Sequence, residues 1–226
     1  MDLAEVVRRR RMVRAFDGRP VAPEALARVL DICRRGPSAG FSQGLDLLVL
    51  EGPEQTGRYW EHSFPDPADR ARFRWQGLFA APVLVVPVVA PGAYAGRYAE
   101  PDKAGSGVAD PAAWTVPYWW VDGGMAVMLL LLAAEDEGLG ALFFTLERPR
   151  TVLHALGVPD DRLALGTVAF GHPAADEPGR SSKRPRRPLT DVVHRGRWSS
   201  AWAAPGQAGP SRARRASTDV AGSRQE

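Results

Sequence analysis

The feature that most limits how this chain can fold is an apolar segment between Asp122 and Glu137. Its longest uninterrupted apolar run, Gly123 to Ala134, is shorter than a bilayer requires and is closed by acidic residues. Because the segment is apolar nearly all round, a helix formed from it needs protein on most of its sides. We therefore expect a central buried helix and no membrane span.

Other segments supply the elements expected around this helix. Leu45 to Leu50 and the valine-rich Val83 to Val89 have the length and composition of buried strands. Ala141 to Phe144 and Leu163 to Phe170 are expected to add two more strands to the same core. Shorter helices are expected over residues 2–11, over 23–36, within 59–79, over 151–156 and over 188–194.

The remaining segments and the chain length indicate how many domains the chain can form. Ala90 to Pro117 is rich in Gly, Ala, Pro and Tyr, and we interpret it as a long excursion that could cover a pocket. A chain of 226 residues with 45% hydrophobic content can build one substantial core, which we expect over residues 1–198. Residues 199–226 offer little apolar surface to offset the entropy of ordering, so a disordered tail is expected there.

Charge and cysteine content narrow the classes of protein. The net charge is +3, and the tail carries +2 of it, from four arginines against Asp219 and Glu226. The body is then close to neutral, which argues against a generic nucleic-acid surface. Cys33 is the single cysteine, so no intramolecular disulfide can form, and the chain opens with charges rather than an apolar signal segment. We expect a cytoplasmic protein.

Two arginine-rich segments have the chemistry of a phosphate site. Arg10, Arg11 and Arg14 lie near the start of the chain, and Arg184 and Arg186 lie near its end. A bound phosphate needs two or three cations in fixed geometry, and arginine makes bidentate contacts better than lysine. The two segments could therefore close on one phosphate from opposite ends of the chain.

A third segment suits a planar, polar ring such as a flavin. It is the loop PSAGFSQ, which contains Ser38, Ala39 and Gln43. Small residues allow backbone N–H groups to approach a ring, and the glutamine side chain can both donate and accept hydrogen bonds. The sequence thus contains residues suited to binding a phosphate and residues suited to binding a flavin ring.

The order of these motifs resembles the FMN-dependent nitroreductase family. It runs RRxVRxF, a helix ending in PSAGxSQ, a buried helix ending in GLG, a strand followed by GHP, and then RPRRPL. The resemblance covers roughly Leu3 to Trp198. It implies an α+β fold, with a mixed or antiparallel sheet packed with helices. It also implies an intertwined homodimer that holds FMN at the subunit interface.

The resemblance also implies roles for particular residues. Arg10, Arg11, Arg14, Arg184 and Arg186 match the family's contacts to the FMN phosphate. The residues that match the surroundings of the isoalloxazine ring are Ser38, Ala39, Gln43, Phe144, Thr145 and Leu146.

Four residues depart from the common family pattern. Met12 stands where many members have a small hydroxyl residue, Phe41 stands where many have Asn, and Gly44-Leu45 replaces Pro-Trp. These changes alter the surroundings of the ring, so the family's substrate range is not carried over to this chain.

The implied activity is that of an FMN-dependent NAD(P)H oxidoreductase. A hydride from NADH or NADPH would reach flavin N5, and electrons would pass to an electron-poor organic acceptor of nitroaromatic or quinone type. The sequence shows no Ser/His/Asp triad or paired-carboxylate pattern, and its four histidines lack metal-ligand spacing, which agrees with chemistry carried by a cofactor. It shows no dinucleotide fingerprint that would choose between NADH and NADPH.

Other functions stay open at this point. The protein could be a flavin-dependent oxidase or dehydrogenase of a natural-product-like substrate, or could fragment reduced flavin. It could instead bind flavin without turnover and dock an acidic partner with its tail, or bind nucleic acid through its arginines. Read singly, the arginine runs could be solvated surface and the 38–43 loop an ordinary connection. We favour flavin binding because the three segments occur together.

Overall fold

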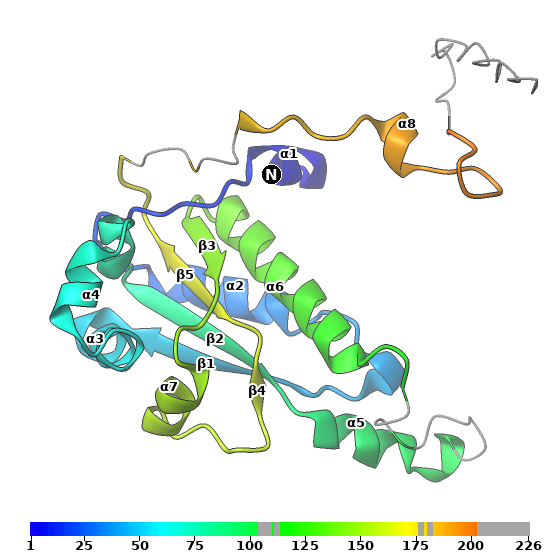
Figure 1. Cartoon of the computed structure of the whole chain (residues 1–226), viewed down its shortest axis with the longest axis horizontal. Coiled ribbons are helices and arrows are strands. Elements are labelled where there is room, and N and C mark those ends of the chain that lie inside the picture. The colour runs from blue at the N-terminus through cyan, green and yellow to red at the C-terminus, as the bar shows by residue number, and fades with distance from the viewer. Residues whose placement is uncertain (104–109, 111–113, 176–178, 180–182, 203–226) are drawn as a thin grey trace, which may run out of the picture. The chain divides into compact units, whose positions relative to one another are not determined.

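The computed structural model describes residues 1–103, 110, 114–175, 179 and 183–202. The chain divides into two compact units, Met1–Glu177 and Pro178–Glu226 (Figure 1). The predicted domain boundary after Trp198 stays a prediction. Of the predicted tail, residues 203–226 lie outside the described residues, while Ala201 forms a β-bridge with His194. The described part of the second unit contains one short helix, α8 (Leu189–Val192).

The first unit is built on one antiparallel sheet. Its strands are β1 (Leu45–Glu51), β2 (Val83–Val89), β3 (Gly140–Phe144), β4 (Leu163–Ala164) and β5 (Thr167–Gly171). The order is β1-β2-β5-β3, and β4 pairs with the end of β2. All of these pairings are antiparallel, which confirms the expected α+β class with an antiparallel sheet.

One predicted strand, residues 163–170, is wrong as a single element. Gly166 interrupts it with φ +147°, and a Cβ at this position would lie 2.6 Å from the Phe144 carbonyl oxygen. Because an L side chain fits neither this φ nor this space, the backbone breaks here into β4 and β5. The apolar pattern alone does not reveal such a break.

Helices cover both faces of the sheet. The helices of the first unit are α1 (Leu3–Arg9), α2 (Pro23–Cys33), α3 (Gly52–Ser63), α4 (Pro67–Arg72), α5 (Pro91–Tyr98), α6 (Tyr118–Asp136) and α7 (Pro149–Ala155). Single 3-10 turns occur at η1 (Ala39–Phe41), η2 (Gln76–Ala80) and η3 (Pro101–Lys103). The helix predicted within 59–79 is instead α3, α4 and η2, because Pro65 and Pro67 interrupt it. The predicted excursion begins with α5 and η3, and residues 104–109 and 111–113 of it lie outside the described residues.

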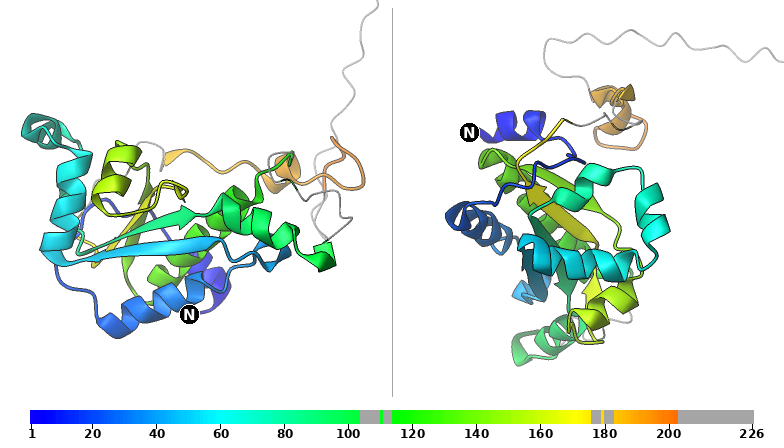
Figure 2. Two further views of the ribbon diagram at one scale, coloured as in Figure 1. Left: turned by 90° about the horizontal axis from the view of Figure 1, so that it is seen from below. Right: turned by 90° about the vertical axis from the view of Figure 1, so that its left-hand side faces the viewer.

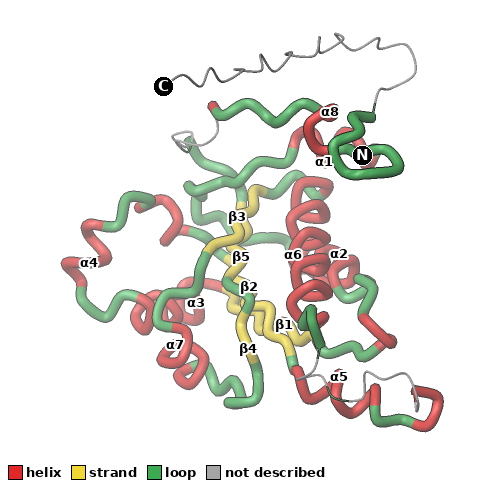
Figure 3. Tube along the Cα trace, turned by 45° about the vertical axis from the view of Figure 1, so that its right-hand side comes forward, coloured by secondary structure: helices red, strands yellow, loops and turns green. Residues whose placement is uncertain are grey.

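The core has two layers, one on each face of the sheet. Val83 and Val85 of β2 pack in a cluster with α2 and α6. Leu84, Val86 and Val88 pack in a second cluster with residues of α3 and α7. Figure 3 shows the sheet between these two helix layers, and the left-hand view of Figure 2 shows β1 and β2 side by side. Both sides of β2 are therefore covered, which is why every residue of this strand is apolar and buried.

Helix α6 is buried on one side only. Leu130 and Ala134 are fully buried in the first cluster, whereas Val121, Met125 and Met128 are exposed. Within one chain, therefore, the expected burial is met on one face of the helix only. By length and composition α6 could cross a membrane, but the core helix of a soluble protein passes the same test, and α6 packs here against α2 and the sheet.

Candidate functional site

The first arginine segment follows α1 and joins the edge of the sheet at β3. Met12 forms a parallel bridge with Ala141, and the Val13 N–H donates to the Ala141 carbonyl oxygen at 2.9 Å. The Phe16 N–H donates to the Gly77 carbonyl oxygen at 3.1 Å. Met12 packs partly against both core clusters, so its side chain serves the core. The segment is thus fixed by backbone hydrogen bonds beside the first residues of β3.

The environment of the Arg10 guanidinium suits a bound anion. Its Nε and Nη1 are buried, and neither has a hydrogen-bond partner among the described residues. Leaving guanidinium N–H groups buried without an acceptor costs free energy, which a bound phosphate oxygen would recover. This is the observation within the chain that best fits a phosphorylated cofactor.

Arg14 and Arg11 have different neighbours. The Arg14 Nη1 donates to the Met12 carbonyl oxygen at 3.1 Å, and its guanidinium lies 5.0 Å from the centre of the Trp75 ring. Arg74 lies over the same ring at 4.3 Å. Arg11 instead lines a hollow beside Arg9, Glu135 and the Gly138–Gly140 turn. The structure therefore separates Arg11 from Arg14, although their shared role in phosphate binding stays a prediction.

Arg74 and Trp75 were missed by the sequence reasoning. They lie before η2, in a stretch that is aromatic and charged, and that composition was the available signal. A cation over an aromatic face is held by the ring quadrupole, so Trp75 orders two guanidinium groups near the Arg10 segment.

The predicted ring residues after β3 have three different environments. The Phe144 ring lies 5.8 Å from the Trp60 ring and nearly parallel to it, at 13°. Thr145 is exposed and lines a hollow of about 130 Å³ with Trp60, Phe144 and other aromatic residues. Leu146 is buried in the core. Phe144 and Thr145 can therefore border a ligand, whereas the Leu146 side chain packs inward.

The predicted flavin loop connects α2 to β1 and is already well ordered within itself. Gly40, Phe41 and Gln43 have φ values of 61°, 57° and 49°, in the left-handed region. The Phe41 N–H donates to the Ser38 carbonyl oxygen at 2.8 Å, and the Gln43 N–H donates to Ser38 Oγ at 3.1 Å. Since these backbone amides are used inside the loop, its group best suited to bind a ring edge is the side-chain amide of Gln43.

Neighbouring helices hold this loop from outside. Asp122 of α6 accepts hydrogen bonds from the Ala39 N–H at 2.8 Å and from the Tyr94 hydroxyl at 2.7 Å. Burial and the adjacent carboxylate raise the pKa of Tyr94, so the phenol stays protonated and donates. A Cβ at Gly44 would lie 2.5 Å from Tyr94 Cε2, which explains glycine there. Phe41 remains 71% exposed at the tip of the loop.

The two halves of the predicted site lie at opposite ends of β2. Met12 is level with Val83, because it pairs with Ala141, Ala141 with Phe170, and Phe170 with Val83. Leu45, just after the flavin loop, pairs with Val89 at the other end. Seven residues of strand separate these levels by about 20 Å. Within one chain, therefore, the structure does not bring the Ser38–Gln43 loop to Arg10 and Arg14.

Arg184 and Arg186 are exposed residues of the second unit. Their contact with a phosphate stays a prediction. Within the described residues, no group of three or more His, Cys, Asp or Glu is placed to hold a metal ion.

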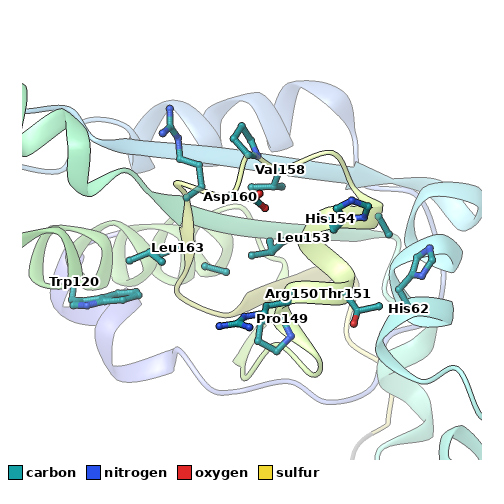
Figure 4. A pocket seen from close by; sticks show the side chains of 14 residues that line it. His62, Trp120, Pro149, Arg150, Thr151, Leu153, His154, Val158, Asp160 and Leu163 are labelled. Atoms are coloured by element: carbon teal, nitrogen blue, oxygen red, sulfur yellow. The ribbon is translucent and has the colours of Figure 1, made fainter.

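A separate cleft of about 1020 Å³ lies beside α7 and β4. His62, Trp120 and His154 line it, and Figure 4 shows Trp120 and His62 at opposite sides of the opening. The lining contains none of the predicted site residues.

Comparison with known proteins supports the resemblance. The sequence model of the nitroreductase family matches residues 7–172. A protein of Methanothermobacter thermautotrophicus named "Putative NADH dehydrogenase/NAD(P)H nitroreductase" is 24% identical over 203 residues, covering 88% of each chain. A nitroreductase family protein from Streptococcus pneumoniae has a TM-score of 0.65 at 17% identity, covering 85% of this chain and 99% of that one. A structure from Desulfovibrio desulfuricans, called "a putative nitroreductase in complex with FMN", has a TM-score of 0.62 at 21% identity, covering 85% and 95%. These structural likenesses show a shared fold.

Proposed function

Because this chain belongs to the nitroreductase family, we propose that it is an FMN-dependent oxidoreductase that acts as a homodimer in the cytoplasm. NADH or NADPH serves as the reductant, and an electron-poor organic molecule of nitroaromatic or quinone type is the acceptor. FMN, when bound, would supply the redox chemistry between the reductant and the acceptor. The chain's own residues bind, orient and shield the cofactor.

The observation that carries the proposal is the division of the site between the two ends of α6. Asp122, near the start of the helix, contacts the loop at Ala39, and Glu135, near its end, lies 3.4 Å from Arg9. The thirteen helical rises between these two residues span about 20 Å. Each end of α6 thus holds one half of a site that neither end completes.

The face of α6 between these ends suits a second copy of the chain. Val121, Met125 and Met128 are exposed along it. A two-fold dimer with antiparallel α6 helices would cover these side chains and bring the Ser38–Gln43 loop of the partner subunit toward Arg10. The dimer interface and the cofactor site would then form together.

Each half would contribute different chemistry. Arg10 and Arg14, with Arg184 and Arg186, would neutralise the phosphate. Gln43 would hydrogen-bond the polar edge of the ring, and Phe144 with Thr145 would border it. Aromatic residues beside Phe144 would exclude water from the reacting face.

The direct test is the colour of the purified protein. We expect a yellow visible spectrum, flavin released by heat, and bleaching by NADH or NADPH without oxygen. Supplying a nitroaromatic, a quinone or oxygen to the reduced protein then identifies the oxidant. A colourless protein that fails to bind added FMN would contradict the proposal, and flavin that no nicotinamide reduces would favour a binding protein without turnover.

A paired substitution tests the phosphate site. Replacing Arg14 and Arg186 together by Ala should weaken FMN retention, on the order of tenfold or more for each lost charge-assisted contact. Arg58→Ala, at an exposed position of α3, is the control and should leave retention unchanged. Equilibrium dialysis measures FMN retention in the wild type, the double variant and the control. Equal retention in the double variant and the wild type would remove both arginines from the site.

A further inference from the structure

We propose that Asp122 is a positioning residue for flavin binding, whose buried carboxylate holds the Ser38–Gln43 loop in the conformation that meets the ring. The inference rests on the proposed function and extends it to a residue outside the predicted site. It also gives a reason for a carboxylate in a helix that is otherwise almost wholly apolar.

The Ser38–Gln43 loop needs support from outside itself. Phe41 and Gln43 are left-handed although neither is glycine, and Gly40 between Ala39 and Phe41 is left-handed as well. Such backbone conformations persist only where surrounding contacts hold them, and they concentrate at functional sites. Hydrogen bonds within the loop order its turn, but they do not tie it to the rest of the fold.

The hydrogen bonds of Asp122 provide this support. Asp122 is only 7% exposed. Its Oδ2 accepts two hydrogen bonds, one from the Ala39 N–H at 2.8 Å and one from the Tyr94 hydroxyl at 2.7 Å. A buried carboxylate is costly unless donors compensate it, and these two donors do so. Tyr94 is 1% exposed, so it holds the carboxylate while the carboxylate holds the loop.

Asp122 also lies beside the candidate flavin site. Asp122 and Tyr94 line a hollow of about 420 Å³ together with Ser38, Phe41 and Gln43. A second tether reaches the same loop, where Arg97 Nε donates to the Gly40 carbonyl oxygen at 2.8 Å. The hydrogen bond at Asp122 therefore lies in the wall of the candidate site, and losing it would change the surface that the flavin contacts.

The experiment compares hydrogen exchange and FMN affinity in the full chain. Asp122→Ala removes the acceptor, and exchange in peptides spanning residues 37–44 should become faster by on the order of tenfold in the apo protein. The Kd for FMN, measured by quenching of flavin fluorescence, should rise by a similar factor. Asp122→Asn keeps a carbonyl oxygen that can accept both bonds, so it should restore both properties.

A matched pair keeps the test decisive if Asp122→Ala does not fold. Tyr94→Phe removes one donor to the carboxylate and should raise exchange in the loop by less than Asp122→Ala. Tyr59→Phe removes an equally buried hydroxyl, 2.7 Å from Thr167 Oγ1 in the other core cluster, and should leave the loop unchanged. Equal loop exchange in these two variants would overturn the inference.

Two outcomes separate this inference from the proposed function. Wild-type protein that binds FMN, together with an Asp122→Ala variant of unchanged exchange, affinity and flavin spectrum, would overturn the role of Asp122 alone. Wild-type protein that binds no FMN would overturn the proposed function. Even then, the exchange measurement would show whether Asp122 holds the loop.

Discussion

At the scale of single residues, neighbours in sequence have unequal tasks. Arg10 presents buried N–H groups without a partner among the described residues, whereas Arg11 lies beside Arg9 and Glu135. Met12, between them and Arg14, packs against the core. Among these neighbouring arginines, Arg10 is suited to an anion, whereas Arg9 and Arg14 have partners within the chain.

Cys33 allows a prediction at this scale. It is fully buried on α2, its Sγ lies 3.5 Å from the Ala126 carbonyl oxygen, and burial raises the pKa of its thiol from 9.0 to about 12. Because the thiolate is the reactive form, native protein at pH 8 should not react with a thiol reagent, while denatured protein should react fully. With a reagent that releases a coloured thiolate, the absorbance measures the extent of reaction in the native and in the denatured protein. Rapid labelling of native protein would contradict this packing.

The same shift predicts a trend of stability with pH. The folded state holds the Cys33 proton more tightly than the unfolded state, so its contribution to folding is complete below pH 9 and declines as the pH rises toward 12. A Cys33→Ala variant has no thiol and so lacks this contribution. Its free energy of unfolding, measured by chemical denaturation, should therefore fall less steeply than that of the wild type between pH 9 and pH 12.

At the scale of elements, β2 and α6 show how burial follows composition. The strand is covered on both faces and is apolar at every position, while α6 is apolar all round but covered on one face only. The helix has the exposed apolar face that a second subunit would cover. Hydrophobic content thus identified which elements are central, but not what lies on each side of them.

Leu130 on α6 tests the contribution of the core-facing side. It is fully buried between α2 and the sheet, so Leu130→Ala should lower the free energy of unfolding by about 2–5 kcal/mol. The matched control is Leu3→Ala on α1, at a residue that is 68% exposed, and it should change stability by about 0.5 kcal/mol or less. Urea denaturation followed by circular dichroism compares the two. Equal losses would contradict the packing of α6.

At the scale of the whole molecule, the proposed site would be complete only in a dimer. The loop at Ser38–Gln43 and the segment at Arg10–Arg14 lie at opposite ends of β2, about 20 Å apart. In a dimer with antiparallel α6 helices, a flavin that contacts both would bridge two copies of the chain. Cofactor content and association state should consequently change together.

Complementation between two defective variants tests this arrangement. Arg10→Ala/Arg14→Ala alters one half of the site, and Ser38→Ala/Gln43→Ala alters the other. In a heterodimer of the two, one site combines both intact halves, so purified heterodimer should bind FMN at up to one site per dimer, while each homodimer binds weakly. Two affinity tags isolate the heterodimer, and visible absorbance reports the flavin. If each chain holds a complete site, the heterodimer will show no recovery.

The sequence by itself determined the secondary elements that local pattern controls. Val83–Val89 is β2 with both predicted ends, because a valine-rich apolar run between turns has few other stable arrangements. The order of the arginine motifs and the PSAGFSQ loop indicated the family that the comparison confirms. The helix at 118–136 was also expected, although its start lies four residues earlier than predicted. Its apolar run has the length of a helix, and Gly138 with its positive φ follows the end of the helix.

Only the tertiary structure decided how these elements combine. The break at Gly166 depends on a carbonyl oxygen of another strand, and Asp122 gains its role from Tyr94 and Ala39, which are distant in sequence. The apolar segment 122–137 proved to be a helix with one covered face and one open face, because burial depends on what packs alongside. Local patterns report each residue's own preferences, but contacts between distant segments are set by the fold, and these contacts divide the candidate site between the two ends of α6.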